Sequence, residues 1–267
     1  MTRTYAITGT NSGIGKATKE LLESAGHRVI GIGRKNTEIV IDLADPEQRA
    51  TLADQVAEAS GGSLDAVMAV AGTVTTTPVD VQVNYFAARE TVESLRPLLL
   101  GSPAPRAVVV SSISAVHPDD PELTQALRDD DEKLAMSLAA RNHENGSGGY
   151  NYTSSKRAIS EWVRSAALTP EWAGAGIPLN NVAPATFITG LTEKIVTTPE
   201  GRAMLAKTTP MPLHGPGEAV VVARLLAWIT SEENTHLTGQ AIFIDGGSEA
   251  VLRGPQVFDG VRMPGAA

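Results

Sequence analysis

The sequence predicts an α/β protein built on one doubly wound parallel sheet of about seven strands, with helices on both faces. Three observations support this fold class. Short apolar runs alternate with amphipathic stretches of helical period, Gly, Pro or Asp residues mark the junctions, and neither an internal repeat nor an interdomain linker interrupts the order. We therefore expect a single domain over residues 1–267. The expected strands cover residues 3–8, 27–32, 38–41, 64–71, 106–110, 177–182 and 241–245.

The first strand leads through a glycine-rich turn into a helix. The turn, Gly-Thr-Asn-Ser-Gly-Ile-Gly over residues 9–15, precedes apolar residues at helical spacing, and Gly26 is the expected C-cap. Glycine lets the backbone approach a diphosphate closely, and a helix N-terminus offers free N–H groups and the positive end of its dipole. A plain turn is the alternative for this motif alone. In its strand and helix context the motif predicts a Rossmann-type dinucleotide site. The expected contacts are Gly9, Asn11, Ser12, Gly13, Ile14 and Gly15.

The end of the second strand bears on the choice of cofactor. Sites for NAD usually place an acid there against the ribose 2′-hydroxyl, whereas sites for NADP place a cation against the 2′-phosphate. Here Gly33, Arg34 and Lys35 follow the strand. The segment therefore favours NADP(H) over NAD(H), with Arg34 as the leading contact and Lys35 as the second. A solvated basic turn is the alternative, and Glu38 keeps NAD possible.

Two more strand ends are expected at the cofactor. The third strand closes with Asp42 and Leu43, and Asp42 is placed to contact the adenine edge. The fourth strand closes with Ala71 and Gly72. Strand ends of one edge line the crevice of an open parallel sheet, so these residues should face the nucleotide. Between the two strands, a Pro at the first helical position predicts a helix over residues 45–59.

Two polar residues near the expected crevice are weak signals when each is taken alone. Asn84 lies among apolar residues of a helix that extends to residue 100, and a mid-helix asparagine is more often a satisfied core group than a catalytic one. Ser112 follows the strand 106–110, where its hydroxyl can reach a bound carbonyl. A serine pair at a strand end is also a common turn signal.

Two segments depart from the regular alternation. Residues 115–149 contain two expected helices, 122–128 and 132–142, separated by three aspartates, and we interpret them as an inserted helical flap beside the crevice. The acidic run is most simply a solvated face with helix N-caps, and selection of cationic substrates is the alternative. Residues 187–215, which include the Pro-rich stretch Pro210-Met211-Pro212, look mobile, and this suits a substrate lid. The Gly/Pro-rich tail to Ala267 is expected to pack late or at an interface.

Tyr152 and Lys156 stand four residues apart at the start of a helical segment, which puts the phenol and the ammonium on one helix face. A free tyrosine has a pKa of about 10, too high for efficient proton transfer near neutrality, so a neighbouring cation that favours phenolate is useful. Lys156 is placed to be that cation. An isolated pair of this kind more often belongs to an ordinary amphipathic helix. The other motifs of the chain favour the catalytic interpretation.

Composition excludes several classes of function. A net charge of −8 without any Lys/Arg-rich run argues against nucleic acid or an anionic membrane as a partner. The chain has no cysteine, which excludes disulfides and thiolate catalysis, and its five histidines form no metal-like cluster. No apolar run reaches the ~20 residues of a membrane span. We therefore expect no metal, a cytoplasmic location and a small-molecule substrate.

Taken together, the motifs resemble the short-chain dehydrogenase/reductase family, whose order they follow over nearly the whole chain. The gap of 40 positions from Ser112 to Tyr152 is most similar to the 3α-hydroxysteroid dehydrogenase/carbonyl reductase subgroup, since most relatives have a much shorter gap. The matching segments are Thr8-Gly9-x-x-x-Gly13-Ile14-Gly15, Val83-Asn84-Tyr85-Phe86, Ser112, Tyr152-x-x-x-Lys156, Asn181-x-x-Pro184 with Thr189, Thr238-Gly239-Gln240 and Ile244-Asp245-Gly246-Gly247.

The resemblance implies a role for each site residue. Tyr152 would protonate the carbonyl oxygen as hydride arrives from the nicotinamide, or remove the alcohol proton in reverse. Ser112 would orient that oxygen, Lys156 would lower the phenol pKa and bind the nicotinamide ribose, and Asn84 would hold a water that relays protons to Lys156. The implied cofactor contacts near the nicotinamide are Pro184, Ala185, Ile188 and Thr189, besides Tyr152 and Lys156.

Three features depart from the pattern of the family. Ala185 replaces a common glycine, Ser12 replaces a basic residue frequent in members that prefer NADP, and Gly33-Arg34 replaces the acid of NAD-using members of the subgroup. The insert also occupies the region where many relatives pair subunits through two helices. A homodimer through another face therefore competes with the usual homotetramer.

The expected function is hydride transfer between NADP(H) or NAD(H) and the carbonyl or secondary alcohol of a bulky apolar substrate, such as a steroid, terpenoid or aromatic compound. An aryl alcohol dehydrogenase of the coniferyl alcohol type is the alternative among enzymes. A redox-sensing or scaffolding protein that binds nucleotide without turnover is the alternative from another class. The presence of both Tyr152 and Lys156 favours the enzyme, because a protein that only binds nucleotide need not keep them.

Overall fold

Seven parallel strands form the central sheet of the computed structural model, which describes residues 2–260. Their spatial order is β3-β2-β1-β4-β5-β6-β9, so the chain winds from β1 first towards one edge and then back towards the other. This order confirms the predicted doubly wound parallel sheet. The strands are β1 (Thr4–Thr8), β2 (Arg28–Gly33), β3 (Ile39–Val40), β4 (Ala66–Ala69), β5 (Arg106–Val110), β6 (Leu179–Pro184) and β9 (Ala241–Ile244).

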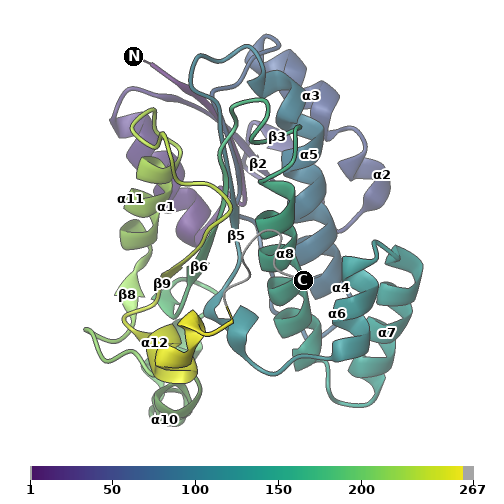
Figure 1. The fold of residues 1–267 in the computed structure, drawn as a ribbon, viewed down its shortest axis with the longest axis vertical. Helices are drawn as coiled ribbons and strands as arrows, with labels where there is room; N and C mark the ends of the chain where they lie inside the picture. The colour runs from purple at the N-terminus through teal and green to yellow at the C-terminus, as the bar shows by residue number, and fades with distance from the viewer. Residues whose placement is uncertain (1, 261–267) are drawn as a thin grey trace.

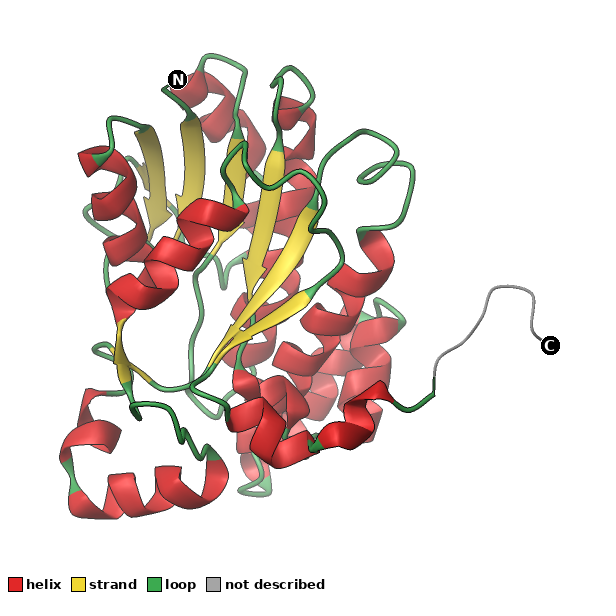
Figure 2. Cartoon of the chain, turned by 60° about the vertical axis from the view of Figure 1, so that its left-hand side comes forward, coloured by secondary structure: helices red, strands yellow, loops and turns green. Residues whose placement is uncertain are grey.

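Helices cover both faces of the sheet, as Figures 1 and 2 show. One face carries α1 (Gly13–Ser24) and α11 (Ala219–Ile229), which pack against each other. The opposite face carries α3 (Leu52–Ser60), α5 (Ala88–Leu99) and α8 (Gly149–Ala166). The prediction of helices on both faces is therefore confirmed.

The strands are apolar on both sides because each side meets a helical layer. Tyr5 and Ile7 of β1 join the hydrophobic cluster under α1 and α11, whereas Ala6 between them joins the cluster under α3, α5 and α8. Successive side chains of a strand point to opposite faces, so a strand buried on both sides has no polar alternation. This explains the continuous apolar runs in the sequence.

Two predicted helices are interrupted in the structure. The stretch expected over 45–59 divides into α2 (Pro46–Arg49) and α3, and the Asp45 carboxylate caps α2 by accepting the Glu47 N–H at 2.9 Å. The helix expected over 83–100 begins as α4 (Val79–Val81), passes through a π-helical turn, η1 (Gln82–Ala87), and continues as α5. A π-helical turn inside a helix is frequent at functional sites.

The insert folds into a 3₁₀ turn, η2 (Ile113–Val116), and two helices, α6 (Pro121–Arg128) and α7 (Glu132–Glu144). These helices pack on each other and against α8 (Figure 1). Asp131 caps α7 by accepting the Leu134 N–H at 2.9 Å, as expected for an acidic run that caps a helix. A role as a flap over the substrate stays a prediction.

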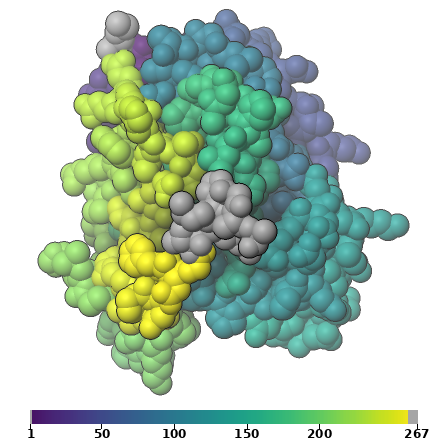
Figure 3. All heavy atoms as spheres, in the orientation of Figure 1, coloured from purple at the N-terminus to yellow at the C-terminus, as the bar shows by residue number. Residues whose placement is uncertain are grey.

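The segment predicted as a lid lies beyond the carboxyl ends of the strands. It contains α9 (Glu193–Thr197) and α10 (Pro199–Thr208), in which no residue is buried, between the paired strands β7 (Phe187–Ile188) and β8 (Gly217–Glu218). In the space-filling view these helices protrude at the lower end of the molecule (Figure 3). Lid movement stays a prediction.

The chain after β9 continues as α12 (Ser248–Arg253) and η3 (Pro255–Phe258), and the last part of the Gly/Pro-rich tail, 261–267, lies outside the described residues. Within residues 2–260, none of the helices has the length and apolar character that crossing a lipid bilayer requires.

Candidate active site

The glycine-rich turn after β1 has a backbone that only glycine accommodates. Gly9 and Gly13 have φ angles of +77° and +54°, in the left-handed region. A Cβ atom on Gly15 would lie 2.3 Å from the Gly9 carbonyl oxygen. Ser12, the residue before α1, makes no side-chain cap, so the first N–H groups of the helix stay available to a ligand. This geometry suits a diphosphate.

The fold brings other predicted cofactor residues against this turn. A Cβ on Gly9 would lie 2.9 Å from Ala71 Cα, and one on Gly13 would lie 3.2 Å from Thr189 Cγ2. The space beside Gly33 is filled by Asn11, whose Oδ1 atom would be 2.1 Å from a Cβ there. Residues far apart in the sequence therefore meet at the carboxyl edge of the sheet, as predicted for a dinucleotide site.

Thr8 is a structural residue of this site to which the sequence analysis assigned no role. Its hydroxyl accepts the backbone N–H groups of Val70 and Ala71 at 2.9 and 3.0 Å. The available signal was a buried hydroxyl on the last residue of a strand, directly before the glycine turn. Thr8 thus ties the end of β4 to the end of β1.

The residues predicted for the adenine side follow β2 and β3, the two strands at one edge of the sheet. Arg34 and Lys35 are exposed in the loop after β2. Asp42 follows β3, where its Oδ1 accepts the Ala44 N–H at 3.0 Å, and Leu43 is buried. Pro184, Ala185 and Ile188 lie at the end of β6 and on β7.

The Glu38 carboxylate has protein partners. It accepts the Gly31 N–H at 2.8 Å and pairs with the Lys19 ammonium of α1. Burial acts to raise the pKa of Glu38, but these two hydrogen bonds outweigh it and the pKa lies below the ordinary value. The carboxylate is therefore ionised and engaged at the middle of β2, away from the strand end where a ribose would bind.

Ser112, Tyr152 and Lys156 come together beyond the end of β5. Ser112 follows β5, and its Oγ accepts the Ser114 N–H at 3.1 Å. Tyr152 and Lys156 share one face of α8, with the Lys156 Nζ 5.8 Å from the centroid of the Tyr152 ring. The buried Lys156 Nζ donates to the Val110 carbonyl oxygen at 3.0 Å.

The two ionisable groups are shifted in opposite directions. Burial raises the pKa of Tyr152 above 10, and a hydrogen bond with Ser112 partly offsets it. The lowering of the Tyr152 pKa expected from Lys156 is therefore not seen in the protein alone, because desolvation of the phenolate dominates. Burial lowers the pKa of Lys156 to about 8, against the opposing effect of the Asp80 charge. At pH 7 Lys156 is mostly protonated and Tyr152 carries its proton.

Asn84 lies within η1 and is fully buried. Its Oδ1 accepts the Thr73 N–H at 3.0 Å and its Nδ2 donates to the Thr73 carbonyl oxygen at 2.9 Å. A Cβ on Gly72 would lie 3.0 Å from Asn84 Oδ1 and 3.4 Å from Lys156 Nζ. The structure thus brings Gly72, Asn84 and Lys156 together, and the water held by Asn84 stays a prediction.

A buried polar network fixes the backbone of α8, the helix that carries Tyr152 and Lys156. The Ser111 hydroxyl donates to the Lys156 carbonyl oxygen at 2.9 Å and lies 2.8 Å from Ser160 Oγ. Asn181 of β6 donates to Ser160 Oγ at 2.8 Å and accepts the Ser111 N–H at 3.1 Å. The only signal for Ser111 in the sequence was its position next to Ser112, a predicted site residue. No local pattern pointed to Ser160.

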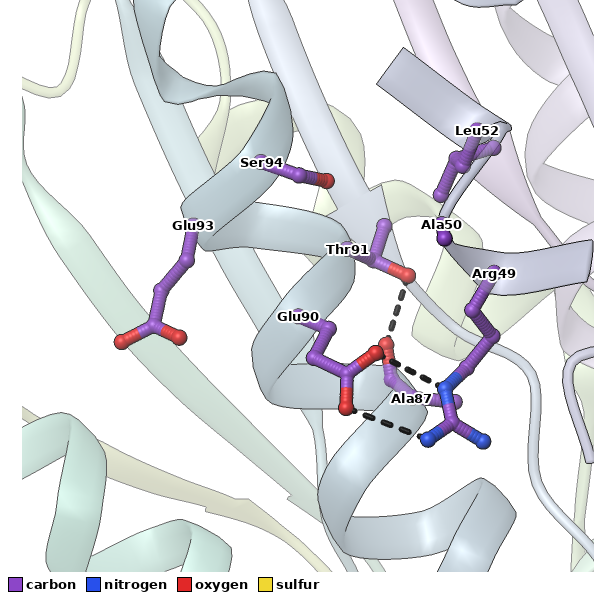
Figure 4. A pocket seen from close by; sticks show the side chains of 8 residues that line it. All are labelled: Arg49, Ala50, Leu52, Ala87, Glu90, Thr91, Glu93 and Ser94. Carbon is purple, nitrogen blue, oxygen red and sulfur yellow. Dashed lines mark hydrogen bonds and ion pairs between the residues drawn. The ribbon is translucent and has the colours of Figure 1, made fainter. Parts of the chain in front are cut away.

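The hollow of about 250 Å³ in Figure 4 is not part of this site. It lies between α2 and α5, where the buried Arg49 donates to Glu90 at 2.8 and 3.2 Å and approaches Glu132 of α7 at 3.6 Å. These ion pairs link α2, α5 and the insert. None of the predicted site residues lines this hollow.

A glycine-rich dinucleotide turn and a Ser, Tyr and Lys set at one edge of a doubly wound sheet define a nicotinamide-dependent oxidoreductase. Comparison with known proteins gives the family. The family model described as enoyl-(acyl carrier protein) reductase matches residues 125–249. The 3-alpha-hydroxysteroid dehydrogenase/carbonyl reductase of Comamonas testosteroni is 35% identical over 256 residues, which cover 94% of this chain and 98% of that protein. The chain belongs to the short-chain dehydrogenase/reductase family.

Solved structures agree with this assignment. The 3-alpha-hydroxysteroid dehydrogenase from Pseudomonas sp. B-0831 complexed with NADH matches with a TM-score of 0.85 and 35% identity, covering 94% of this chain and 98% of that one. The Pseudomonas aeruginosa RhlG/NADP active-site complex shares the fold, with a TM-score of 0.73, 23% identity, and coverage of 92% of this chain and 96% of that one. The protein is accordingly an NAD(P)-dependent oxidoreductase, and the predicted resemblance is confirmed.

Proposed function

We propose that the protein transfers a hydride between NADP(H) or NAD(H) and the carbonyl or secondary alcohol of a bulky apolar substrate, with Tyr152 as general acid/base. The observation that carries this proposal is the meeting of Ser112, Tyr152 and Lys156 beside Gly72, at the edge that also holds the glycine-rich turn. A bound nicotinamide supplies or accepts the hydride. The chain's own residues orient the substrate oxygen and move its proton.

In this mechanism Ser112 hydrogen-bonds the substrate oxygen and holds it at the Tyr152 hydroxyl. The raised pKa of Tyr152 keeps the phenol protonated near neutrality, which suits proton donation to a carbonyl during reduction. Lys156, buried and mostly protonated at pH 7, offers a cation to the developing phenolate and a donor to the nicotinamide ribose. Asn84 holds the water that returns a proton to Lys156.

The substrate class is supported by the lid and by the relatives. Three large apolar side chains of the predicted lid, residues 187–215, are exposed, namely Leu191, Met204 and Leu213. Such a surface can bury an apolar ligand when it closes. A relative at 35% identity is a 3-alpha-hydroxysteroid dehydrogenase/carbonyl reductase. We therefore favour a steroid, terpenoid or aromatic carbonyl compound.

The direct test is oxidation of NADPH and NADH by the purified protein across steroid ketones, cyclic monoterpenones and aromatic aldehydes, including coniferyl aldehyde. We expect turnover with at least one class of carbonyl compound, measured as the loss of NADPH or NADH absorbance. Preference for coniferyl aldehyde would support the aryl alcohol alternative. Tight nucleotide binding without turnover across the whole panel would argue for a nucleotide sensor or scaffold instead.

Cofactor preference is the next element of the proposal, and we favour NADP(H). Arg34 and Lys35 are exposed after β2, and Glu38, the nearby acid, is engaged by Gly31 and Lys19. A cation at this position pairs with the 2′-phosphate that distinguishes NADP from NAD.

Arg34→Asp is therefore expected to raise the Kd for NADPH by about tenfold to a hundredfold, equivalent to about 1.4–2.8 kcal/mol, while the Kd for NADH changes by less than about threefold. Quenching of intrinsic fluorescence gives both constants. Arg28→Asp, the same charge change at the amino end of β2, is the matched control and should leave both constants near wild type. Equal losses for the two nucleotides in Arg34→Asp would remove this residue from the 2′-phosphate.

The remaining predictions concern the assembly and its location. A homodimer or a homotetramer is expected, and light scattering on the purified protein measures the mass directly. A cytoplasmic location and the exclusion of nucleic acid and membrane as partners also stay predictions.

A further inference from the structure

Asp80 is a fully buried carboxylate beside the site, to which the sequence analysis assigned no role. It lies in α4, one helical turn before Asn84. Burying an ionised carboxylate without partners is strongly unfavourable. Here the carboxylate accepts four donors of a threonine-rich loop, residues 73–77: the Thr73 hydroxyl at 2.9 Å, the Thr75 hydroxyl at 2.9 Å, the Thr75 N–H at 2.8 and 3.0 Å, and the Thr76 N–H at 2.8 Å.

The loop held by Asp80 adjoins Asn84, and the residue before it adjoins Lys156. Thr73 is fixed at three points, because its hydroxyl donates to Asp80 and its backbone N–H and carbonyl both pair with the Asn84 side chain. The preceding residue, Gly72, approaches Lys156 so closely that a Cβ there would lie 3.4 Å from Nζ. The position of the chain next to the ammonium therefore depends on Asp80 and Asn84 together.

The tip of the loop is strained and is held from both sides. Thr76 has a φ of +59°, an uncommon conformation for a β-branched residue, which persists only where the surroundings impose it. From the inside, Asp80 accepts the Thr76 N–H. From the outside, the Thr76 carbonyl accepts a hydrogen bond from His143 Nδ1 of α7 at 3.0 Å and would lie 2.0 Å from a Cβ on Gly148. The insert therefore helps to set the same loop.

Asp80 lies on α4, which packs against the helices that carry the titratable groups of the site. The helices packed against α4 contribute Tyr152 and Lys156 from α8 and His143 from α7. The negative charge of Asp80 raises the pKa of Lys156, and it also raises the pKa of Tyr152. A buried charge acts over a longer range than an exposed one because water does not screen it.

We propose that Asp80 is a positioning residue of the active site, which holds residues 72–76 against Lys156 and Asn84 and supplies the negative charge that retains the ammonium form of Lys156. It acts through the loop and through its field, without touching the substrate. The proposal rests on the proposed function of Tyr152 and Lys156. It extends that function by naming the group that keeps the buried lysine charged.

The test compares Asp80→Asn with wild type in the pH dependence of carbonyl reduction between pH 6 and 9. We expect the alkaline limb, near pH 8 in wild type, to move down by about one pH unit, since an opposite charge beside an ionisable group shifts it by an amount of this order. At pH 6, both proteins retain the ammonium, so any difference in rate there reports structure alone. At pH 8, the variant should be slower than wild type by a further factor of about five. A displaced loop alone would lower the rate equally at every pH.

Three further variants separate charge from structure. Thr73→Val removes one donor from the loop and keeps the carboxylate, so its limb should stay at the wild-type pH. Asp80→Glu keeps the charge with a longer side chain, so its limb should stay near pH 8 while its rate falls. Asp80→Ser is a second neutral variant, to be used if Asp80→Asn does not fold. It should shift the alkaline limb in the same direction. An unshifted limb in a folded neutral variant, or the same shift in Thr73→Val, would overturn the proposal.

The same comparison can be made without turnover. Nucleotide binding should weaken as Lys156 loses its proton, and this transition, followed by cofactor fluorescence, should also move to lower pH in Asp80→Asn. A shifted binding transition with no turnover in wild type would refute the proposed function and support the role of Asp80. Turnover that depends on Tyr152, with both transitions unshifted in Asp80→Asn, would refute the role of Asp80 and leave the proposed function intact.

Discussion

Tyr152→Phe is expected to lower kcat by about 10²–10⁴-fold while nucleotide Kd values change by less than about threefold, because the substitution removes only the proton-carrying hydroxyl. The aromatic ring that lies under Lys156 remains. The hydroxyl also interacts with Ser112, whose side chain acts to lower the Tyr152 pKa, so the variant loses this interaction as well. Steady-state reduction of a carbonyl substrate, together with fluorescence titration of NADPH and NADH, measures both effects.

Tyr150→Phe is the matched control for this experiment. Tyr150 lies two residues earlier on α8, 43% exposed, so losing its hydroxyl should change kcat by less than about twofold. Equal rates in Tyr152→Phe and Tyr150→Phe would show that Tyr152 is not the proton donor. A loss of nucleotide affinity that matches the loss of rate would place its role in binding.

Lys156→Met is expected to abolish measurable turnover and at the same time to stabilise the fold. Burial lowers the pKa of Lys156 from 10.5 to about 8, so at pH 7 the folded protein carries a charge that is more favourable in the unfolded chain. The difference of about 2.5 units corresponds to a cost on the order of 3 kcal/mol. Methionine removes this cost but leaves the Val110 carbonyl without its donor, which costs about 1–3 kcal/mol. We therefore expect a net gain of about 1 kcal/mol, or roughly 3 °C in Tm.

The pH dependence of this stability difference has a definite sign. Between about pH 8 and 10.5 the unfolded state binds more protons than the folded one, so wild type gains stability relative to the variant as pH rises. The excess Tm of Lys156→Met should therefore be largest at pH 7 and shrink towards pH 10. Differential scanning calorimetry at several pH values measures it.

Lys133→Met, a change at an exposed lysine of α7, is the control and should show no such trend. A Lys156→Met protein that is less stable than wild type at pH 7, with a difference that does not change up to pH 10, would contradict the cost assigned to the buried ammonium.

The elements that follow from local physics were predicted correctly from the sequence. The apolar runs gave the strands of the sheet because both of its faces are buried, and the glycine spacing gave the β1–α1 turn because Gly9 and Gly13 require positive φ angles. The breaks within 45–59 and 83–100 were missed. Helix propensity and hydrophobic periodicity do not predict a π-helical turn. The turn at Asn84 occurs together with a hydrogen bond between Asn84 and Thr73, which only the folded chain provides.

Cofactor choice shows where sequence reasoning stops. The sequence placed Arg34 and Glu38 within four residues of each other, so that Arg34 favoured NADP while Glu38 kept NAD possible. Only the folded chain engages Glu38 with Gly31 and Lys19 and leaves Arg34 exposed. The partner of a charged side chain depends on which helix packs over the strand, and a local pattern does not contain that information.

The sequence by itself determined the order of strands and helices and the glycine-rich turn, and it singled out Ser112, Tyr152 and Lys156 as candidates, because backbone conformation and side-chain chemistry are local properties. The tertiary structure alone decided the environment in which these groups act. It buried Lys156 and lowered its pKa, raised that of Tyr152, and placed Asp80 and the loop 73–77 against them. Desolvation and buried hydrogen bonds depend on residues that the strand order brings together from distant parts of the chain.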